Sequence, residues 1–395
     1  ATVFRVGFNR ADQLFWREPG YLPYRGLPDA WPAHLESLVG QHGITDVVLY
    51  GASRPIHAPA FAMGVRTHVF EEGYLRPYWI TYERGGANAA SPLMDLTLAQ
   101  MDTALAQNQP KLTEAPDRWG DMRQHMFWGA AYHAVLMTGN RGYPGFQPHR
   151  TPGVNREFLL HFAKLANTPL RAAMRAIAST RIRRGGFPYH LVLLQLAHDA
   201  NFRDFGPFDD QASFIDEVMH GFAHGAPSHH HLVLKAHPLE DGREPLRPLI
   251  STLAARHGLT ERVHFVSGGK LAKLLHSARS AVTVNSTSAE QALWRGLPLK
   301  VYGDAVFNRP EFVSSQPTAA FFAAPKMPDR AAYLTYRAFL LATSQIPGGF
   351  YAYRNRRKIV RQLPDLMLAS KDPYAQILCP ESGNAATKQH LRAVL

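Results

Sequence analysis

The sequence predicts an α/β fold with two Rossmann-like domains that face a central cleft and a C-terminal helix that packs back across them. Two series of apolar strands alternate with helices, one before residue 92 and one after residue 186. Such alternation favours parallel sheets with right-handed crossovers. A mostly helical stretch between the series ends at Arg184-Gly185-Gly186, which we interpret as a hinge. The predicted division is an N-terminal α/β domain with a helical insertion (1–185), a C-terminal α/β domain (186–345) and a returning helical segment (346–395).

The first series begins with an apolar strand over residues 2–8, followed by a helix over 34–42 and strands over 46–50 and 67–70. Ligands of parallel sheets gather beyond the carboxyl ends of the strands. Side chains that follow these strands are therefore expected to face one cleft: Asn9, Asp12, Ser53, Arg54, His57, Glu71, Glu72, Tyr74 and Arg76. The aromatic residues of this region, Tyr74, Tyr78, Trp79 and Tyr82, suit a sugar or lipid surface but equally suit a core.

The helical stretch contains apolar residues at helical spacing from Leu170 to Ile182, with Arg171, Arg175 and Arg181 between them. The simpler interpretation is a core helix with a solvated basic face. The alternative is a basic surface that rests on anionic lipid.

The second series predicts strands over residues 189–196, 231–236, 262–266 and 281–285. A basic amphipathic segment over residues 349–368 follows it and predicts the returning helix. Two Rossmann-like halves, a hinge and a closing helix together suggest the GT-B architecture of glycosyltransferases.

The segment Ala281 to Tyr302 predicts a buried strand, a hydroxyl-rich turn, a short helix and another strand. Ser288 is expected to cap the helix, with Gln291 completing a capping box. Ser286 and Thr287 add hydroxyls beside a helix N-terminus, a combination that suits a phosphate. An ordinary β-α unit that binds nothing fits this segment equally well.

Two further groups of polar residues follow strands of the second series. In LVLKAHP, Lys235 and His237 stand where the strand ends, so they could contact a phosphate or protonate a leaving group. In QLAHDANFRDFGPF, Gln195 and Asp199 are expected to line the cleft, with Asp199 as base or nucleophile. The alternatives are a structural role for His237 and a capping role for Asp199.

Composition limits the classes of function. The chain has 395 residues, a formal charge of +12 and a pI of about 9.8, which favours polyanionic partners. We find no nucleic-acid-binding signature, so we expect no nucleic acid partner. No apolar run is long enough to span a bilayer, no signal peptide is evident, and the single Cys379 fits a reducing cytosol. Adjacent residues in His229-His230-His231 alternate sides of a strand, so no metal site is expected.

Five segments carry a resemblance to a known family: YGASRPIHAPA, VFEEGYLRPYWITYE, QLAHDANFR, LVLKAHP and VNSTSAEQALWRGLPLKVYG. Together they resemble the bacterial capsule polysaccharide biosynthesis family, which includes the β-Kdo transferases of the capsule lipid linker. FEEGYLRP is the most specific element, and the resemblance extends from about Phe4 to Met367. The chain looks most like the single-module type that starts the linker on lyso-phosphatidylglycerol.

The resemblance implies a retaining enzyme that uses CMP-β-Kdo, with no cofactor and no metal. On that template, Lys235, His237 and the Ser286–Thr287–Ser288 turn would hold the CMP phosphate. Asp199 would be the nucleophile, and Glu71 or Glu72 the base towards the acceptor. Sugar and acceptor contacts are expected from Asn9, Asp12, Arg54, His57, Arg76, Gln195 and Glu290. His198 stands where related transferases often have a second acidic residue, which puts a two-carboxylate arrangement at this motif in doubt.

The implied partners are an anionic lipid acceptor, the inner face of the cytoplasmic membrane and other capsule assembly proteins. Two alternatives stay open at this point. The first is a transferase that uses another CMP-sugar or nucleotide-sugar, and the second is a non-catalytic scaffold of the capsule export complex.

Overall fold

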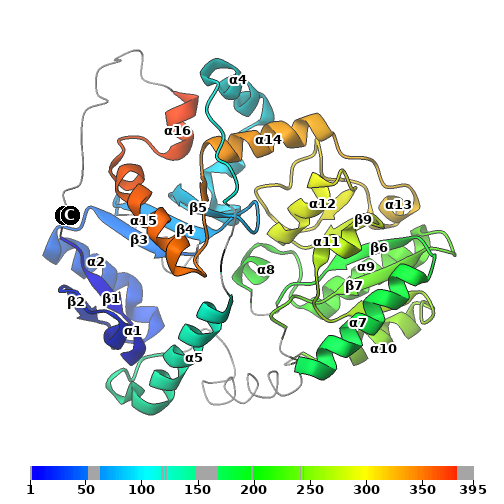
Figure 1. Cartoon of the computed structure of the whole chain (residues 1–395), viewed down its shortest axis with the longest axis horizontal. Helices are drawn as coiled ribbons and strands as arrows, with labels where there is room; N and C mark the ends of the chain where they lie inside the picture. The colour runs from blue at the N-terminus through cyan, green and yellow to red at the C-terminus, as the bar shows by residue number, and fades with distance from the viewer. Residues whose placement is uncertain are drawn as a thin grey trace.

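The computed structural model describes residues 2–51, 63–116, 120, 122–147, 168–196, 199–240, 242 and 244–379. Two lobes, each built on its own sheet, lie side by side (Figure 1). The first lobe holds the sheet β11-β5-β4-β3, and the second holds the sheet β10-β9-β6-β7-β8. The predicted α/β class, with two separate sheets, is confirmed.

The sheet of the second lobe is parallel throughout. Its strands are β6 (Tyr189–Leu193), β7 (His231–Lys235), β8 (Val263–Val266), β9 (Ala278–Thr283) and β10 (Leu299–Val301). Leu191 and Leu193 of β6 belong to one apolar cluster, while Val192 belongs to another. Because neighbouring side chains of a strand point to opposite faces, both faces of this sheet are buried.

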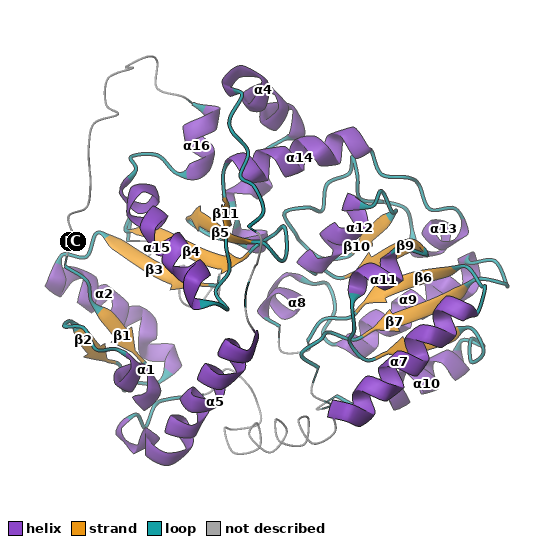
Figure 2. Ribbon diagram, viewed as in Figure 1, coloured by secondary structure: helices purple, strands orange, loops and turns teal. Residues whose placement is uncertain are grey.

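Helices cover the two faces of this sheet (Figure 2). The cluster around Val192 contains apolar residues of α9 and α10, and the cluster around Leu191 contains apolar residues of α7, α11 and α12. The helices of this lobe are α7 (Thr168–Arg184), α8 (Ala200–Phe205), α9 (Gln211–Gly225), α10 (Leu246–Arg256), α11 (Leu271–Leu275), α12 (Glu290–Trp294) and α13 (Thr318–Ala323). α7 packs on β8, so this helix lies with the second lobe although it precedes residue 185.

The sheet of the first lobe is mixed, whereas the alternating pattern predicts a mainly parallel sheet. β3 (Asp46–Tyr50) and β4 (Arg66–Glu72) are parallel. β5 (Trp79–Arg84) returns antiparallel to β4 after a short turn, which leaves no room for a crossover helix. β11 (Gln345–Pro347) adds an antiparallel edge from far along the chain.

The N-terminal strand lies outside both large sheets. β1 (Arg5–Gly7) pairs in parallel with β2 (Tyr21–Pro23). The helices α1 (Arg10–Phe15), η1 (Pro28–Ala30) and α2 (Trp31–His42) complete this subregion. The expectation that β1 shares a sheet with β3 and β4 is therefore wrong, because a two-stranded pair with β2 satisfies its backbone instead.

The middle of the chain is helical in its described parts, as predicted. Its elements are η2 (Asn88–Ala90), η3 (Pro92–Asp95), α4 (Leu98–Asn108), α5 (Met122–Gly139) and η4 (Asn140–Gly142). Thr97 and Gln100 form a capping box at the start of α4.

The C-terminal part of the described chain returns to the first lobe (Figure 1). α14 (Arg330–Ala342) and α16 (Pro373–Leu378) both pack on α4. α15 (Tyr353–Leu368) contributes Ile359 to a cluster with Phe70 and Ile80 of the first sheet.

The lobes are joined by direct contacts. Arg309 of the second lobe donates to the carbonyl oxygens of Leu93 and Leu96 at 2.7 and 2.6 Å. α8 packs against η2, so the segment that follows β6 touches the segment that follows β5.

Candidate active site

The carboxyl ends of β6, β7 and β9 meet at one edge of the parallel sheet. Gln195 follows β6, and its Nε2 donates to Oδ1 of Asn285, which follows β9, at 2.9 Å. The backbone N–H of Asn285 donates back to Oε1 of Gln195 at 3.0 Å. Because this reciprocal amide pair is buried, it fixes the two strand ends relative to each other. Gln195 therefore lies at the predicted edge of the sheet, but its side-chain amide is bonded to Asn285 and so has a structural role there.

Lys235 and His237 lie at the end of the neighbouring strand, β7. Lys235 is buried, and its Nζ donates to the carbonyl oxygen of Ala236 at 3.3 Å. Burial lowers the pKa of Lys235 to about 8, and the Arg175 guanidinium adds to the effect. The half-buried His237 accepts the N–H of Leu239 at its Nδ1, at 3.1 Å.

The hydroxyl turn follows β9 at the same edge, but its cap differs from the prediction. The N-cap is Ser286, the chain first forms the 3-10 turn η5 (Thr287–Ala289), and α12 begins only at Glu290. Ser288 thus lies inside the first turn, and its Oγ contacts the Oγ of Ser286 at 2.9 Å. The predicted capping box of Ser288 and Gln291 is wrong, because no side chain caps either helix. Ser286, Thr287 and Ser288 remain half-buried at the strand end.

Glu290 does not reach this edge. It is buried, and its carboxylate accepts from the hydroxyls of Tyr333 and Tyr336 of α14 at 3.4 and 3.3 Å. Burial raises its pKa to about 8. The expected contact of Glu290 with sugar or acceptor is therefore replaced by a structural contact in the core.

Asp199 is the N-cap of α8, and its Oδ1 accepts the N–H of Asn201 at 3.0 Å. The capping role that the sequence left open is thus present. Asn285 donates from Nδ2 to the carbonyl oxygen of Asn201 at 2.6 Å, which ties the start of α8 to the sheet edge. This bond holds the start of α8, and with it the half-buried Asp199, on the side of the lobe where α8 packs against η2.

Glu71 and Glu72 are the last residues of β4 in the first lobe. Glu71 accepts the N–H of Glu72 at Oε1, at 2.9 Å, and the amide of Asn88 at Oε2, at 3.5 Å. Glu72 accepts the hydroxyl of Tyr50 at 3.4 Å and that of Tyr351 in a shorter bond. The two carboxylates therefore have different partners, as their adjacent positions predict.

The negative charge of Asp199, from the second lobe, reaches Glu71 in the first. Burial raises the pKa of Glu71, and the negative charges of Glu72 and Asp199 raise it further. The Glu72 N–H and the Arg76 guanidinium oppose this shift. Arg76 thus lies near the cluster, where its Nε donates to the carbonyl oxygen of Gly73 at 3.4 Å, and its expected contact with sugar or acceptor stays a prediction. A raised carboxylate pKa beside a second carboxylate is typical of sites that move protons.

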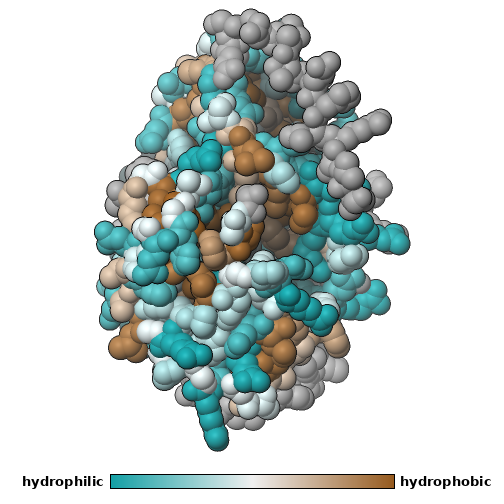
Figure 3. Space-filling view, turned by 90° about the vertical axis from the view of Figure 1, so that its left-hand side faces the viewer, coloured by the Kyte–Doolittle hydropathy of each residue, from teal (hydrophilic) through white to brown (hydrophobic). Residues whose placement is uncertain are grey.

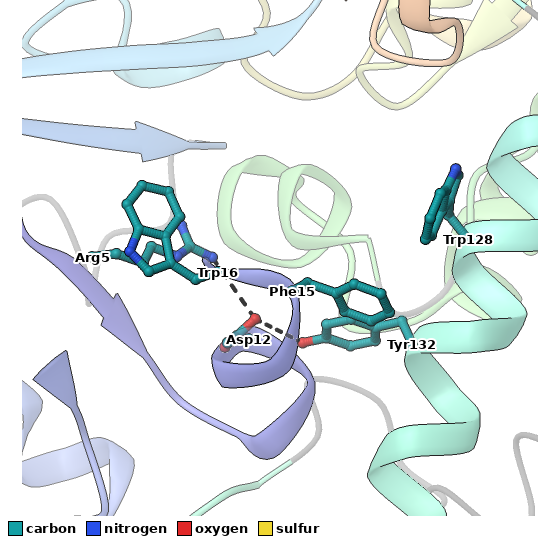
Figure 4. A pocket seen from close by; sticks show the side chains of 6 residues that line it. All are labelled: Arg5, Asp12, Phe15, Trp16, Trp128 and Tyr132. Carbon is teal, nitrogen blue, oxygen red and sulfur yellow. Dashed lines mark hydrogen bonds and ion pairs between the residues drawn. The ribbon is translucent and has the colours of Figure 1, made fainter. Parts of the chain in front are cut away.

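Asn9 and Asp12 lie apart from this cluster, contrary to the expectation of one shared cleft. They belong to the small β1–β2 subregion, where the Oδ1 of Asn9 caps α1 and Asp12 accepts the hydroxyl of Tyr132 at 3.1 Å. Asp12 lines a separate hollow of about 310 Å³ (Figure 4), together with Arg5, Phe15, Trp16, Trp128 and Tyr132. The cause is the pairing of β1 with β2, which removes these loops from the first sheet.

Some of the predicted residues lie outside the described residues: Ser53, Arg54, His57 and His198. Of the predicted aromatic surface, Tyr74, Trp79 and Tyr82 are buried in the core.

Within the described ranges, no three His, Cys, Asp or Glu side chains are arranged to hold a metal ion, and no helix has the length and apolar character to cross a bilayer.

The structure adds residues that the sequence reasoning missed. Tyr50, Asn88 and Tyr351 all contact the glutamates. The N–H of Asn88 donates to the hydroxyl of Tyr74 at 2.7 Å, and this hydroxyl donates to the buried Glu83 at 2.7 Å. Asn88 has a φ of 56°, which an asparagine tolerates better than most residues. In the sequence, the position of Asn88 shortly after Gly85-Gly86 is the one feature that indicates a turn there.

Comparisons with known proteins agree with the resemblance carried by the motifs. The sequence model of a family described as "Capsule polysaccharide biosynthesis protein" matches residues 45–351. The capsule polysaccharide export protein KpsS of Escherichia coli is 30% identical over 360 residues, covering 89% of this chain and 90% of that protein. The capsule polysaccharide modification protein LipB of Neisseria meningitidis serogroup B is 30% identical over 365 residues, covering 89% and 86%.

Among solved structures, the beta Kdo 2,7 transferase of Thermosulfurimonas dismutans KpsC aligns with 91% of this chain and 95% of its own, at 14% identity and a TM-score of 0.44. The structural likeness is therefore distant, and the sequence relatives carry the assignment. The chain belongs to the capsule polysaccharide biosynthesis family.

Proposed function

We propose that this chain is a retaining β-Kdo transferase that moves Kdo from CMP-β-Kdo to lyso-phosphatidylglycerol, or to a Kdo-lipid, in capsule linker synthesis. It would work at the inner face of the cytoplasmic membrane. The observation that carries the proposal is the packing of α8, which Asp199 caps, against η2, whose Asn88 donates to Glu71, so that a carboxylate from each lobe lies near this junction. Family membership supports the capsule role, and the carboxylate pair supports a reaction by double displacement.

In the first step, an oxygen of Asp199 attacks the anomeric carbon of Kdo, and the bond from this carbon to the phosphate oxygen of CMP breaks. The electron pair of that bond leaves with CMP. The product is a Kdo ester of Asp199, and the hydrogen bond from the N–H of Asn201 holds the attacking carboxylate in orientation.

In the second step, a hydroxyl of the acceptor attacks the same carbon from the opposite face. Its proton passes to Glu71, and the ester bond to Asp199 breaks, which regenerates the carboxylate. The raised pKa of Glu71 suits it to accept this proton. Two inversions give overall retention.

The departing CMP would be held at the edge formed by β7 and β9. His237, Lys235 and the hydroxyls of Ser286, Thr287 and Ser288 are the candidates. A single phosphate gains one negative charge as it leaves, and an ammonium, an imidazole and hydroxyls can stabilise it without a metal ion.

Intact-protein mass spectrometry after incubation with CMP-Kdo alone tests the proposal. We expect a Kdo-sized adduct on the unaltered chain and on Glu71→Gln, and none on Asp199→Asn. Asp210→Asn is the matched control, because Asp210 also caps a helix, α9, and accepts the N–H of Ser213 at 2.8 Å. An adduct that persists in Asp199→Asn would contradict the assigned nucleophile. A panel of CMP- and UDP-sugars distinguishes a transferase with a different donor.

A second candidate is a non-catalytic role in capsule export, which the name of the Escherichia coli relative, a capsule polysaccharide export protein, favours. For this role, Asp199→Asn and Glu71→Gln should leave capsule production intact in cells. Loss of capsule with normal amounts of folded protein would exclude it.

A further inference from the structure

The surface formed by α1 and α5 carries large apolar side chains that no described residue covers. We call it the α1–α5 face and define it by Leu14, Phe15, Met126, Phe127 and Trp128, which are 43–65% exposed. The rings form one continuous series, with centroid distances of 5.3 Å for Phe127–Trp128 and 5.8 Å for Trp128–Phe15. An exposed apolar patch of this kind on a folded protein marks an interaction site.

The patch has a hollow at its centre. Phe15 stacks on Tyr132 at 6.4 Å, and Trp128 stands across from them on α5 (Figure 4). Hydrophobic side chains also form patches among hydrophilic ones on the side of the molecule that faces left in Figure 1 (Figure 3). Tryptophan and phenylalanine at a water-exposed apolar surface suit the boundary between lipid headgroups and acyl chains.

Basic residues flank this patch: Arg10 lies on α1, Arg17 just after α1, and Arg141 on η4, which follows α5. Arg10, Arg17 and Arg141 are exposed, and Glu18 is the exposed acidic residue beside them. Arg10 reaches from α1 to the last residue of α5, since a Cβ at Gly139 would lie 3.0 Å from its Cδ. Aromatic and aliphatic side chains flanked by arginines match an anionic bilayer in both apolar character and charge.

The α1–α5 face is connected to the carboxylates through α5. α5 begins beside the candidate site, because Gln124 accepts the N–H of Tyr353 at 3.0 Å and His125 packs on Tyr351, which contacts Glu72. Trp128 lies three residues beyond His125, which is about 4.5 Å of helix rise. α5 therefore runs from the aromatic residues of this face to Tyr351, which contacts Glu72.

We propose that the α1–α5 face docks on the surface of an anionic lipid bilayer. The placement of an acceptor beside Glu71 and Glu72 rests on the proposed function, whereas binding to the bilayer does not. A second copy of the chain is a poorer occupant, because a two-fold interface would bring two copies of the same arginine-flanked patch together.

Vesicle flotation of the full chain tests the docking. We expect binding to vesicles that contain phosphatidylglycerol, weaker binding to phosphatidylcholine alone, and weakening by added salt. Phe127→Ser with Trp128→Ser should lower the apparent partition coefficient about tenfold. Met126→Ser should lower it less, and its matched control Met327→Ser, at a methionine 73% exposed in the second lobe, should leave it unchanged.

Two results would overturn the docking: equal binding of the double variant and the unaltered chain, or no binding to anionic vesicles at all. Light scattering that shows a dimer lost in the double variant, without vesicle binding, would assign the face to self-association instead. Asp199→Asn should bind vesicles normally, so failure of the proposed catalysis and failure of the docking are distinguishable.

Discussion

At the scale of single residues, the first lobe contains a fully buried carboxylate, that of Glu83, which Tyr74 and Asn88 connect to the candidate base Glu71. Glu83 accepts the hydroxyls of Ser91 at 2.6 Å and Tyr74 at 2.7 Å, and that of Tyr374 in a shorter bond. Burial raises its pKa to about 7. Through Tyr74 and Asn88, this carboxylate supports the segment that contacts both Glu71 and α8.

The raised pKa of Glu83 predicts a pH-dependent stability. Between pH 4.5 and 7 the folded chain holds a proton that the unfolded chain has lost, so this contribution is complete below pH 4.5 and disappears as the pH rises through 7. Its size is on the order of 3 kcal/mol. Urea unfolding at a series of pH values should show that Glu83→Gln flattens this fall.

The control for this prediction is Glu114→Gln, at an exposed glutamate. This variant should keep the pH profile of the unaltered chain. An unchanged profile in Glu83→Gln would mean that Glu83 does not titrate in this range.

At the scale of elements, the C-terminus of α15 is capped by a side chain from the first sheet. The Nη2 of Arg84 donates to the carbonyl oxygens of Leu366, Met367 and Ala369 at 3.0, 3.2 and 2.7 Å. The last carbonyls of a helix lack partners within it, and a cation is favoured there. Arg84 thus fastens the returning helix to β5.

Arg84→Ala should lower the free energy of unfolding by about 1–3 kcal/mol, because it leaves these carbonyls without their donor. Hydrogen exchange of the α15 amides should accelerate more than that of the second lobe. Arg361→Ala, on the exposed surface of α15, is the matched control and should change little. Equal exchange rates in both variants would show that the cap does not hold the helix.

The elements differ in how well the sequence predicts them, and the reason is physical. Leu232 to Leu234 is a continuous apolar run, typical of a strand buried on both faces, and it identifies the centre of β7 from composition. β11 has three residues and gains its partner only through a contact with β5, so no local pattern announces it. Asp199 and Glu71 are each predicted as chemical residues, but their proximity depends on how the two lobes dock. The misplacement of Asn9 and Asp12 has another origin, the pairing of β1 with β2 outside the first sheet, which no local pattern reveals either.

At the scale of the whole molecule, the Arg309 guanidinium bridges the lobes. Arg309 donates to the carbonyl oxygens of Leu93 and Leu96, and its guanidinium lies 5.6 Å from the ring of Tyr336. The partners lie just after η2, so the bridge stands beside the segment that touches α8. Its loss should affect both stability and the approach of Asp199 to Glu71.

Arg309→Ala should cost about 2–4 kcal/mol of unfolding free energy, because two carbonyls lose a charged donor. Small-angle scattering should show a larger radius of gyration, since the lobes lose a fixed contact. Arg330→Ala, at an exposed position on α14, serves as the control. Unchanged scattering and an unchanged unfolding midpoint would exclude Arg309 as a bridge.

The antiparallel pairing of β11 with β5 affects how the first lobe folds during synthesis on the ribosome. The edge of β5 stays bare until Gln345 to Pro347 have left the exit tunnel, long after Trp79 to Arg84 have emerged. During that interval the nascent first lobe offers an unprotected strand to other chains. An unpaired edge of this kind is a target for chaperones that bind nascent polypeptides, so depleting them should lower the yield of folded first lobe.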